Sequence, residues 1–198
     1  MSAALVNGYI LVSSPDVKAV YKGPDRAPWE SVNDDYYGGR LPPILRAAYE
    51  AMRSDEARGL WWVTCKELAA AIPFAEFVRG RGRSVELLAV RSPYLANSQD
   101  RQEWEEPRAV FLGVDVISVG EWSLLRVIQE SRHPACHELD IMMNDAGLLP
   151  DASSVSTIEQ RYRELASENI VEPIAGPNSG IVIEPVEVYA LKAGDEDR

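Results

Sequence analysis

The sequence has little cysteine, a deficit of positive charge and no long apolar run. Only two cysteines, Cys65 and Cys136, occur in 198 residues, which is too few for a disulfide framework and typical of a reducing cytosol. No stretch reaches the roughly 18 unbroken apolar residues of a membrane span. The first residues show neither the basic start nor the apolar run of a signal peptide. These absences predict a cytoplasmic protein that does not associate with a membrane.

The charge balance bears on the kind of partner. Twenty Lys and Arg residues stand against 31 Asp and Glu residues, which gives a formal net charge of -11. Affinity for nucleic acid depends on Lys and Arg that displace counterions from phosphates, and docking on anionic lipid also needs basic residues. We therefore expect neither a nucleic acid nor a membrane as the partner, and a basic protein surface fits the charge better.

The hydrophobic content of 46% is enough for a core that needs neither disulfide nor metal. Periodicity and turn residues predict five strands and five helices. The strands are expected at residues 5–13, 59–64, 84–91, 108–118 and 180–191, and the helices at 41–54, 65–79, 121–131, 134–146 and 154–169. This order predicts a single α+β domain over residues 1–192, with a mixed or antiparallel sheet, helices covering one face, and a polar tail at 193–198.

Two local sequence features add predictions for the last helix and the last strand. Ser156 and Glu159 have the spacing of a capping box at the start of the last helix. Pro185 cannot donate a hydrogen bond to a neighbouring strand, which predicts that the last strand lies at a sheet edge or carries a bulge.

The densest group of possible metal ligands or catalytic residues is the segment from His133 to Glu138, which also holds Cys136 and His137. His133 and His137 have the i, i+4 spacing of zinc ligands on a helix. However, Pro134 favours His133 as a helix N-cap with Cys136 buried behind it, and neighbouring Cys136 and His137 point in different directions. We therefore expect no metal, no cofactor and no catalytic residue. A small enzyme that pairs Cys65 or Cys136 with one of the histidines stays open as the alternative.

Two acidic, aromatic segments are predicted to be loops that bind a partner. Residues 30–37 place two aspartates beside two tyrosines, and residues 100–106 place three glutamates around a tryptophan. Aromatic rings supply contact area at a low entropic cost, and carboxylates attract a basic partner. The alternative is that each aromatic packs on the core beside solvated acids. The predicted partner-binding residues are Asp34, Asp35, Tyr36, Tyr37, Glu103, Trp104, Glu105 and Glu106.

The second half of the chain carries a series of short motifs. They comprise Gly113, Asp115 and Val116 at the end of a strand, Ser123 and Leu124 in a helix, and Asn144, Gly147 and Leu148 in a turn, followed by residues 162–173 and a strand at 181–191. In this order they resemble a group of bacterial immunity proteins that neutralise toxins of polymorphic-toxin and contact-dependent inhibition systems. Val114 and Met143 stand where those proteins have an aromatic residue and a leucine.

The resemblance implies a non-enzymatic protein of bacterial competition that binds a cognate toxin domain and occludes its active site. A basic nuclease is one such toxin that would suit the acidic chain. The motif residues also have structural roles that need no partner. Asp115 can cap a helix or turn, Gly147 can supply a positive φ, and Asn144 can bond a loop backbone.

Overall fold

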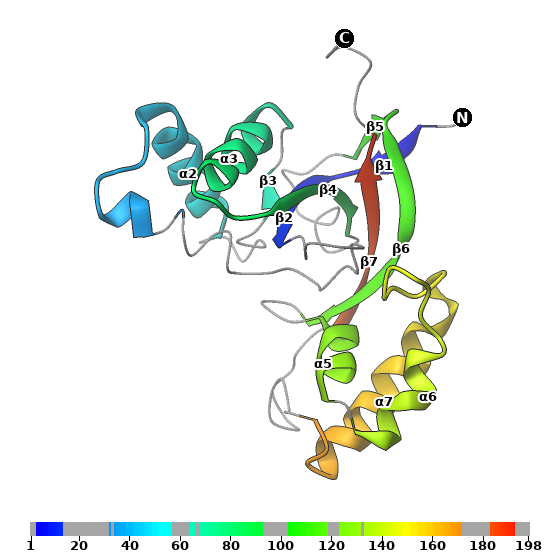
Figure 1. Ribbon diagram of the computed structural model, residues 1–198. Helices are drawn as coiled ribbons and strands as arrows, with labels where there is room; N and C mark the ends of the chain where they lie inside the picture. Colours follow the sequence, from blue (N-terminus) through cyan, green and yellow to red (C-terminus); the bar gives the residue numbers. More distant parts are fainter. Residues whose placement is uncertain are drawn as a thin grey trace.

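A five-stranded antiparallel sheet in the order β3-β2-β4-β7-β6 lies at the centre of the computed structural model (Figure 1). The structure describes residues 3–13, 32, 34–56, 64–65, 68–92, 103–118, 123–131, 133–171 and 183–192. The strands are β2 (Gly8–Ser13), β3 (Thr64–Cys65), β4 (Val85–Arg91), β6 (Ala109–Ser118) and β7 (Ile183–Leu191). A separate two-stranded ribbon pairs β1 (Ala4–Val6) with β5 (Trp104–Glu106). The α+β class with an antiparallel sheet is confirmed.

The first predicted strand is divided in two at Asn7. The Asn7 side chain is fully buried, donates to the Ser92 carbonyl at 2.8 Å and accepts from the Ser92 backbone N–H at 3.1 Å. This reciprocal pair satisfies an amide that would otherwise be costly to bury. It also fixes the point where the chain leaves the ribbon and enters the main sheet.

Strand β2 is buried on both faces. Ile10, Leu11 and Val12 are at most 3% exposed, and successive side chains of a strand point to opposite faces. Both sides of the sheet are therefore covered at this strand. In the sequence, such a strand appears as a continuous run of apolar residues rather than as an alternation of apolar and polar residues.

The helices form two groups along the sheet (Figure 1). The first group, α2 (Pro43–Glu56) and α3 (Leu68–Gly80), lies beside β2, β3 and β4. The second group lies beside β6 and consists of α5 (Leu124–Ser131), the 3-10 turn η1 (Pro134–Cys136), α6 (His137–Asp140), the 3-10 turn η2 (Ala152–Ser154) and α7 (Val155–Ser167). None of the helices in the described ranges is both long and apolar enough to cross a bilayer.

Helical spacing explains which side chains enter the core. In α3, Ala71, Phe74, Ala75 and Val78 recur every three or four residues and are buried, and such positions share one face of a helix. Burying a side chain as large as Phe74, which is 0% exposed, contributes about 2 to 3 kcal/mol. The core cluster also includes residues of α5 and α7, among them Ile128 and Leu165.

Two predicted helix boundaries were wrong. The helix expected at 134–146 ends at Asp140, because the Asn144 side-chain oxygen accepts from the backbone N–H groups of Ala146 and Leu148 and turns the chain. The capping box was also wrong, since Ser156 lies inside α7. Upstream of it, Asp151 caps η2 by accepting from the Ser153 N–H at 2.7 Å.

Strand β7 is a central strand of the sheet rather than an edge strand, but Pro185 itself lies where one of its two neighbouring strands has ended. Strand β7 pairs with β6 on one side and β4 on the other, but the β4 ladder ends where Arg91 faces Glu187. Pro185 lies two residues beyond that point, opposite Val116 of β6. The missing N–H faces the side where β4 has ended, so a proline is tolerated there.

Some predicted features fall partly or wholly outside the described residues. Of the strand expected at 59–64 only Thr64 is described, paired together with Cys65 in β3. The start of the second acidic segment, residues 100–102, and the polar tail at 193–198 also lie outside.

Candidate functional site

The first predicted partner-binding segment forms a helical turn rather than a loop. Residues 34–37 are helical and lead into Gly39, whose φ is +70°. Asp35 is 5% exposed and accepts from Arg40 Nε at 2.7 Å and from an Arg81 guanidinium nitrogen at 3.0 Å. Asp35 therefore ties this turn to the end of α3 and offers little surface to a partner.

The two tyrosines of this turn differ in exposure. Tyr36 is half-buried, stacks near Tyr49 at 5.0 Å between ring centroids, lies under the Arg46 guanidinium and donates to Glu50 at 3.1 Å. Tyr37 is 66% exposed. Among the described residues of the first segment, Asp34 and Tyr37 have the side chains that a partner can reach most freely.

The second predicted segment also differs from expectation, since Trp104, Glu105 and Glu106 form strand β5. Trp104 is half-buried and donates from Nε1 to the Tyr9 hydroxyl at 3.2 Å, which in turn donates to Glu106 Oε2 at 2.8 Å. Arg108 Nε donates to the other Glu106 oxygen at 3.0 Å. Glu106 is 5% exposed, so the tryptophan and this glutamate pack inward.

Burial and hydrogen bonding shift the pKa values in this network. Burial raises the pKa of Tyr9 to about 12; the Trp104 N–H opposes this rise and the Glu106 carboxylate adds to it. For Glu106, burial alone would raise the pKa, but hydrogen bonds from Arg108 and Tyr9 outweigh it and hold the pKa below its usual value. Glu106 is thus an ionised, buried carboxylate with its charge compensated.

A second network lies on the same face of the sheet. Arg91 donates to Glu103 at 2.8 Å and contacts Glu187 at 3.5 Å, and the Tyr189 hydroxyl donates to Glu187 at 2.6 Å. Burial, followed by the Glu187 carboxylate, raises the Tyr189 pKa. The strand register places Tyr9, Arg91 and Tyr189 on one face, because residue 89 pairs with both tyrosines and Arg91 is two positions further along β4.

These two networks attach β5 and the preceding residue to the main sheet. The sequence analysis missed Tyr9, Arg91, Arg108, Glu187 and Tyr189. Alternation in the last strand could have placed Glu187 and Tyr189 on a common face. It could not have shown that Arg91, which lies 96 residues before Glu187, supplies the partner of that carboxylate.

The structure does not bring the two predicted segments together. Figure 1 shows the turn at residues 34–37 beside α2, well separated from β5 at the other side of the main sheet. Glu105 is exposed on β5. Asp34 of the first segment and Glu105 of the second are exposed and form no ion pair with any residue of the described ranges.

The histidine and cysteine segment has the arrangement of a helix start. His133 caps η1 by accepting from the Ala135 N–H at 3.2 Å. Cys136 is buried and accepts from the Ser131 hydroxyl at 2.9 Å, whereas His137 is exposed. Cys65 lies in β3, far from this segment in Figure 1. Within the described part of the chain, no three His, Cys, Asp or Glu side chains are grouped so that they could hold a metal ion.

The motif residues of the second half interlock with one another. Ser123 donates to Asp115 at 2.6 Å and accepts from the Arg126 N–H, so it caps α5. Asn144 donates to the Leu112 carbonyl at 2.7 Å and Gly147 has a φ of +74°. The structural roles expected for Asn144 and Gly147 are present, whereas the helix cap expected at Asp115 is supplied by Ser123, and Asp115 accepts from the Ser123 hydroxyl and the Val116 N–H instead.

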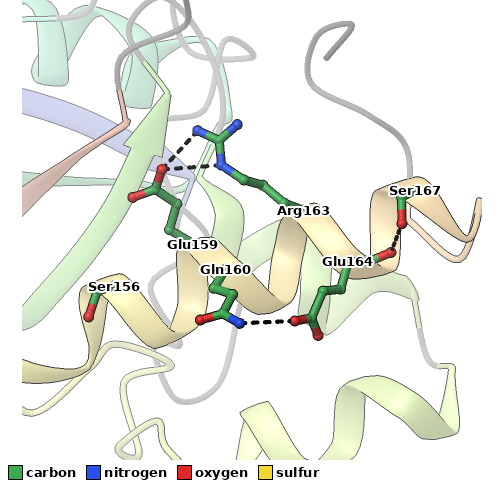
Figure 2. A pocket seen from close by; sticks show the side chains of 6 residues that line it. All are labelled: Ser156, Glu159, Gln160, Arg163, Glu164 and Ser167. Carbon is green, nitrogen blue, oxygen red and sulfur yellow. Dashed lines mark hydrogen bonds and ion pairs between the residues drawn. The ribbon is translucent and has the colours of Figure 1, made fainter.

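A shallow polar depression follows one face of α7 (Figure 2). It is lined by Ser156, Glu159, Gln160, Arg163, Glu164 and Ser167. Arg163 is paired with Glu159, Gln160 with Glu164, and the Ser167 hydroxyl with a backbone carbonyl. Because a single helix supplies every lining residue and their polar groups bond to one another, no set of groups converges on a ligand.

In comparisons with known proteins, no family model, no curated protein and no solved structure matches this chain.

Proposed function

We propose that the chain is a cytoplasmic immunity protein that binds a cognate toxin domain through a basic surface and occludes its active site. The observation that carries the proposal is the surplus of surface carboxylates without an ionic partner. Asp34, Glu105, Asp140 and Asp145 are exposed and form no ion pair with any residue the structure describes. In contrast, described arginines such as Arg91 and Arg108 are held by carboxylates.

The surplus is strongest in the second group of helices. Residues 133–171 hold seven acids (Glu138, Asp140, Asp145, Asp151, Glu159, Glu164 and Glu168) against two arginines (Arg161 and Arg163), a formal balance of -5. A surface of one sign accelerates association with a partner of the opposite sign. The resemblance of the motif residues to immunity proteins supplies the class of that partner, a toxin domain.

The structure narrows the residues we propose for direct contact. Asp34, Tyr37 and Glu105 are exposed, whereas Asp35 and Glu106 are buried in ion pairs. Tyr36, Glu103 and Trp104 are half-buried and position their neighbours. A basic partner would meet the exposed residues first, and rings at the contact would then exclude water.

The test begins with capture of the tagged protein from its native host and identification of a stoichiometric partner. The partner's domain is then expressed under an inducible promoter with and without this chain. We expect the domain to arrest growth alone and the chain to restore growth. A partner that is harmless by itself would contradict the proposal.

Electrostatic steering gives the same proposal a kinetic readout. The association rate should fall about tenfold between 50 and 500 mM salt. Asp34→Lys combined with Glu105→Lys should slow association and flatten the salt dependence. The matched control carries Glu76→Lys combined with Glu130→Lys, which makes the same change in net charge at exposed positions of α3 and α5 outside both segments. Equal rates for the double variant and the control would contradict the proposed contact residues.

A further inference from the structure

Within the described part of the chain, the outer edge of β6 is covered along most of its length but has no hydrogen-bonding neighbour at its start. Strand β6 is an edge strand of the sheet and lies at the border of the molecule in Figure 1. Val114 exchanges backbone hydrogen bonds with Leu149 at 2.8 and 3.0 Å, and the Leu112 carbonyl accepts from Asn144. No described residue forms a hydrogen bond with the outer edge of residues 109–111.

The register shows which backbone groups face outward there. The Lys192 N–H donates to the Arg108 carbonyl at 3.0 Å, which makes residues 108 and 192 a hydrogen-bonded pair. Hydrogen-bonded and non-hydrogen-bonded pairs alternate in an antiparallel ladder. Since Val110 faces Ala190 in the same register, Ala109 and Phe111 direct their N–H and C=O groups away from β7. Two donors and two acceptors are thus presented at the spacing of an added strand.

The side chains around this edge are apolar and exposed. Val110 is 38% and Phe111 46% exposed, and Leu5 of the neighbouring β1 is 43% exposed. Phe111 rests with one side of its ring near Tyr189, 5.5 Å between centroids. An exposed, apolar strand edge promotes unwanted pairing between chains. A binding partner that pairs with this edge would explain why its side chains are apolar and exposed.

Carboxylates lie at both ends of the open stretch. Glu105 is exposed and precedes Ala109 by four residues. Asp145 is also exposed and follows Asn144, whose side chain donates to the Leu112 carbonyl. The intervening Arg108 is engaged by Glu106. The edge therefore offers hydrogen-bonding backbone and apolar surface between two negative charges.

We infer that residues 109–111 of β6 accept an extended segment of the partner protein, carrying basic side chains, as an added strand. Main-chain hydrogen bonds would supply affinity and the flanking carboxylates would select basic residues. A second copy of this chain is disfavoured, because it would bring together two molecules of net charge -11. The inference rests on the proposed function in that it names where the basic partner docks.

The experiment uses labelled ten-residue peptides and the full chain. The probe alternates Val and Lys; one control peptide alternates Val and Glu, and another is the Val-Lys peptide with alternate backbone nitrogens methylated. We expect the Val-Lys peptide to bind and each control to bind at least about tenfold more weakly. In the wild-type protein, bound probe should slow amide exchange at Ala109 and Phe111 about tenfold.

Variants locate the site. Ala109→Pro removes an outward donor without touching the β7 ladder and should weaken probe binding about tenfold. Glu105→Lys and Asp145→Lys should each weaken it about threefold, while Glu76→Lys, an exposed position on α3, should not. Equal binding of the methylated peptide, unchanged exchange at the edge, or equal losses in Glu76→Lys would each overturn the inference.

The outcomes separate this inference from the proposed function. If Ala109→Pro stays folded and still neutralises the toxin at full strength, the docking edge is wrong and the function stands. If the edge binds the probe but the captured partner is harmless, the edge stands and the function is wrong. A dimer of the chain that Ala109→Pro dissociates in sedimentation would assign the edge to a second copy and overturn the inference.

Discussion

At the scale of single residues, Glu106 and Tyr9 show how a buried charge is held at the base of a surface strand. The carboxylate is compensated by Arg108 and accepts from the Tyr9 hydroxyl. A buried ion pair contributes little net stability against an apolar alternative, but removing one partner is costly. The network thus fixes the position of β5, which presents Glu105 to solvent.

Tyr9 should give the protein an alkaline limit to its stability. Its pKa is raised from 10.0 in the unfolded chain to about 12 when folded, so its contribution is intact below pH 10 and is lost as the pH rises toward 12. The loss amounts to about 3 kcal/mol. Tyr9→Phe should remove this part of the decline in urea unfolding between pH 9 and 12.

Tyr37→Phe is the matched control, because Tyr37 is exposed. Some loss of stability at alkaline pH should remain in every variant, because the pKa of Tyr189 is also raised. At pH 7, Tyr9→Phe should cost about 1 to 2 kcal/mol through the lost hydrogen bonds. An alkaline decline in Tyr9→Phe as steep as that of the wild type would contradict the assignment.

Gly113 is required where the turn at 144–149 meets β6. Its φ is +153°, and an added Cβ would lie 2.6 Å from the Leu148 Cβ and 2.7 Å from the Leu149 carbonyl oxygen. Gly113→Ala should lower the free energy of unfolding by about 2 to 4 kcal/mol. Gly80→Ala is the control, since nothing lies within 4 Å of the added Cβ there; similar losses in urea unfolding would contradict the steric argument.

At the scale of elements, the two halves of strand β6 differ in how far the rest of the described chain covers their outer edge. Its second half is covered by the turn at Leu149 and linked to α5 through Asp115 and Ser123. In its first half no described residue bonds the outer edge, and the side chains of Val110 and Phe111 are exposed. The bulge between Phe111 and Gly113 separates the halves, and bulges commonly mark such changes in strand direction.

The contact between Asp115 and Ser123 should couple α5 to the sheet. Ser123→Ala removes both the cap of α5 and a buried donor to Asp115, which should cost about 1 to 3 kcal/mol. Ser123→Thr should restore most of the stability. Ser156→Ala, on the exposed face of α7, is the control and should change thermal unfolding little; an equal effect of both alanine variants would contradict this coupling.

At the scale of the whole molecule, charge is distributed unevenly. Residues 133–171 carry five of the eleven surplus negative charges, whereas residues 68–92 hold Arg79, Arg81, Arg83 and Arg91 against Glu76 and Glu86. A basic partner approaching the chain would therefore be oriented before contact. The salt dependence of association expected for the proposed toxin complex belongs to this scale, because it reports the summed field rather than one pair.

The sequence by itself determined the class of the fold, most of the elements and the helix start at His133. These depend on hydrophobic periodicity and on local capping, which act over a few residues. It also determined the roles of Asn144 and Gly147, which shape the turn in which they lie, whereas the cap predicted for Asp115 is supplied by Ser123. Element ends were less accurate, because Asn144 and Asp151 redirect the chain through side-chain hydrogen bonds that compete with the helix.

Only the tertiary structure decided which members of the acidic, aromatic segments are surface. The sequence predicted Asp35 and Glu106 as exposed carboxylates. In the structure both are buried, because Arg81 forms an ion pair with Asp35 and the Tyr9 hydroxyl donates to Glu106, although these partners are distant in sequence. Glu105 forms no ion pair with a described residue and stays exposed, and Tyr37 is exposed as well. The edge of β6 at residues 109–111, to which no described residue bonds, likewise follows from the strand order and from the turn at residues 144–149, which covers only the second half of the strand. Long-range contacts of this kind leave no periodic trace in the sequence, because their energy comes from groups that meet only once the chain has folded.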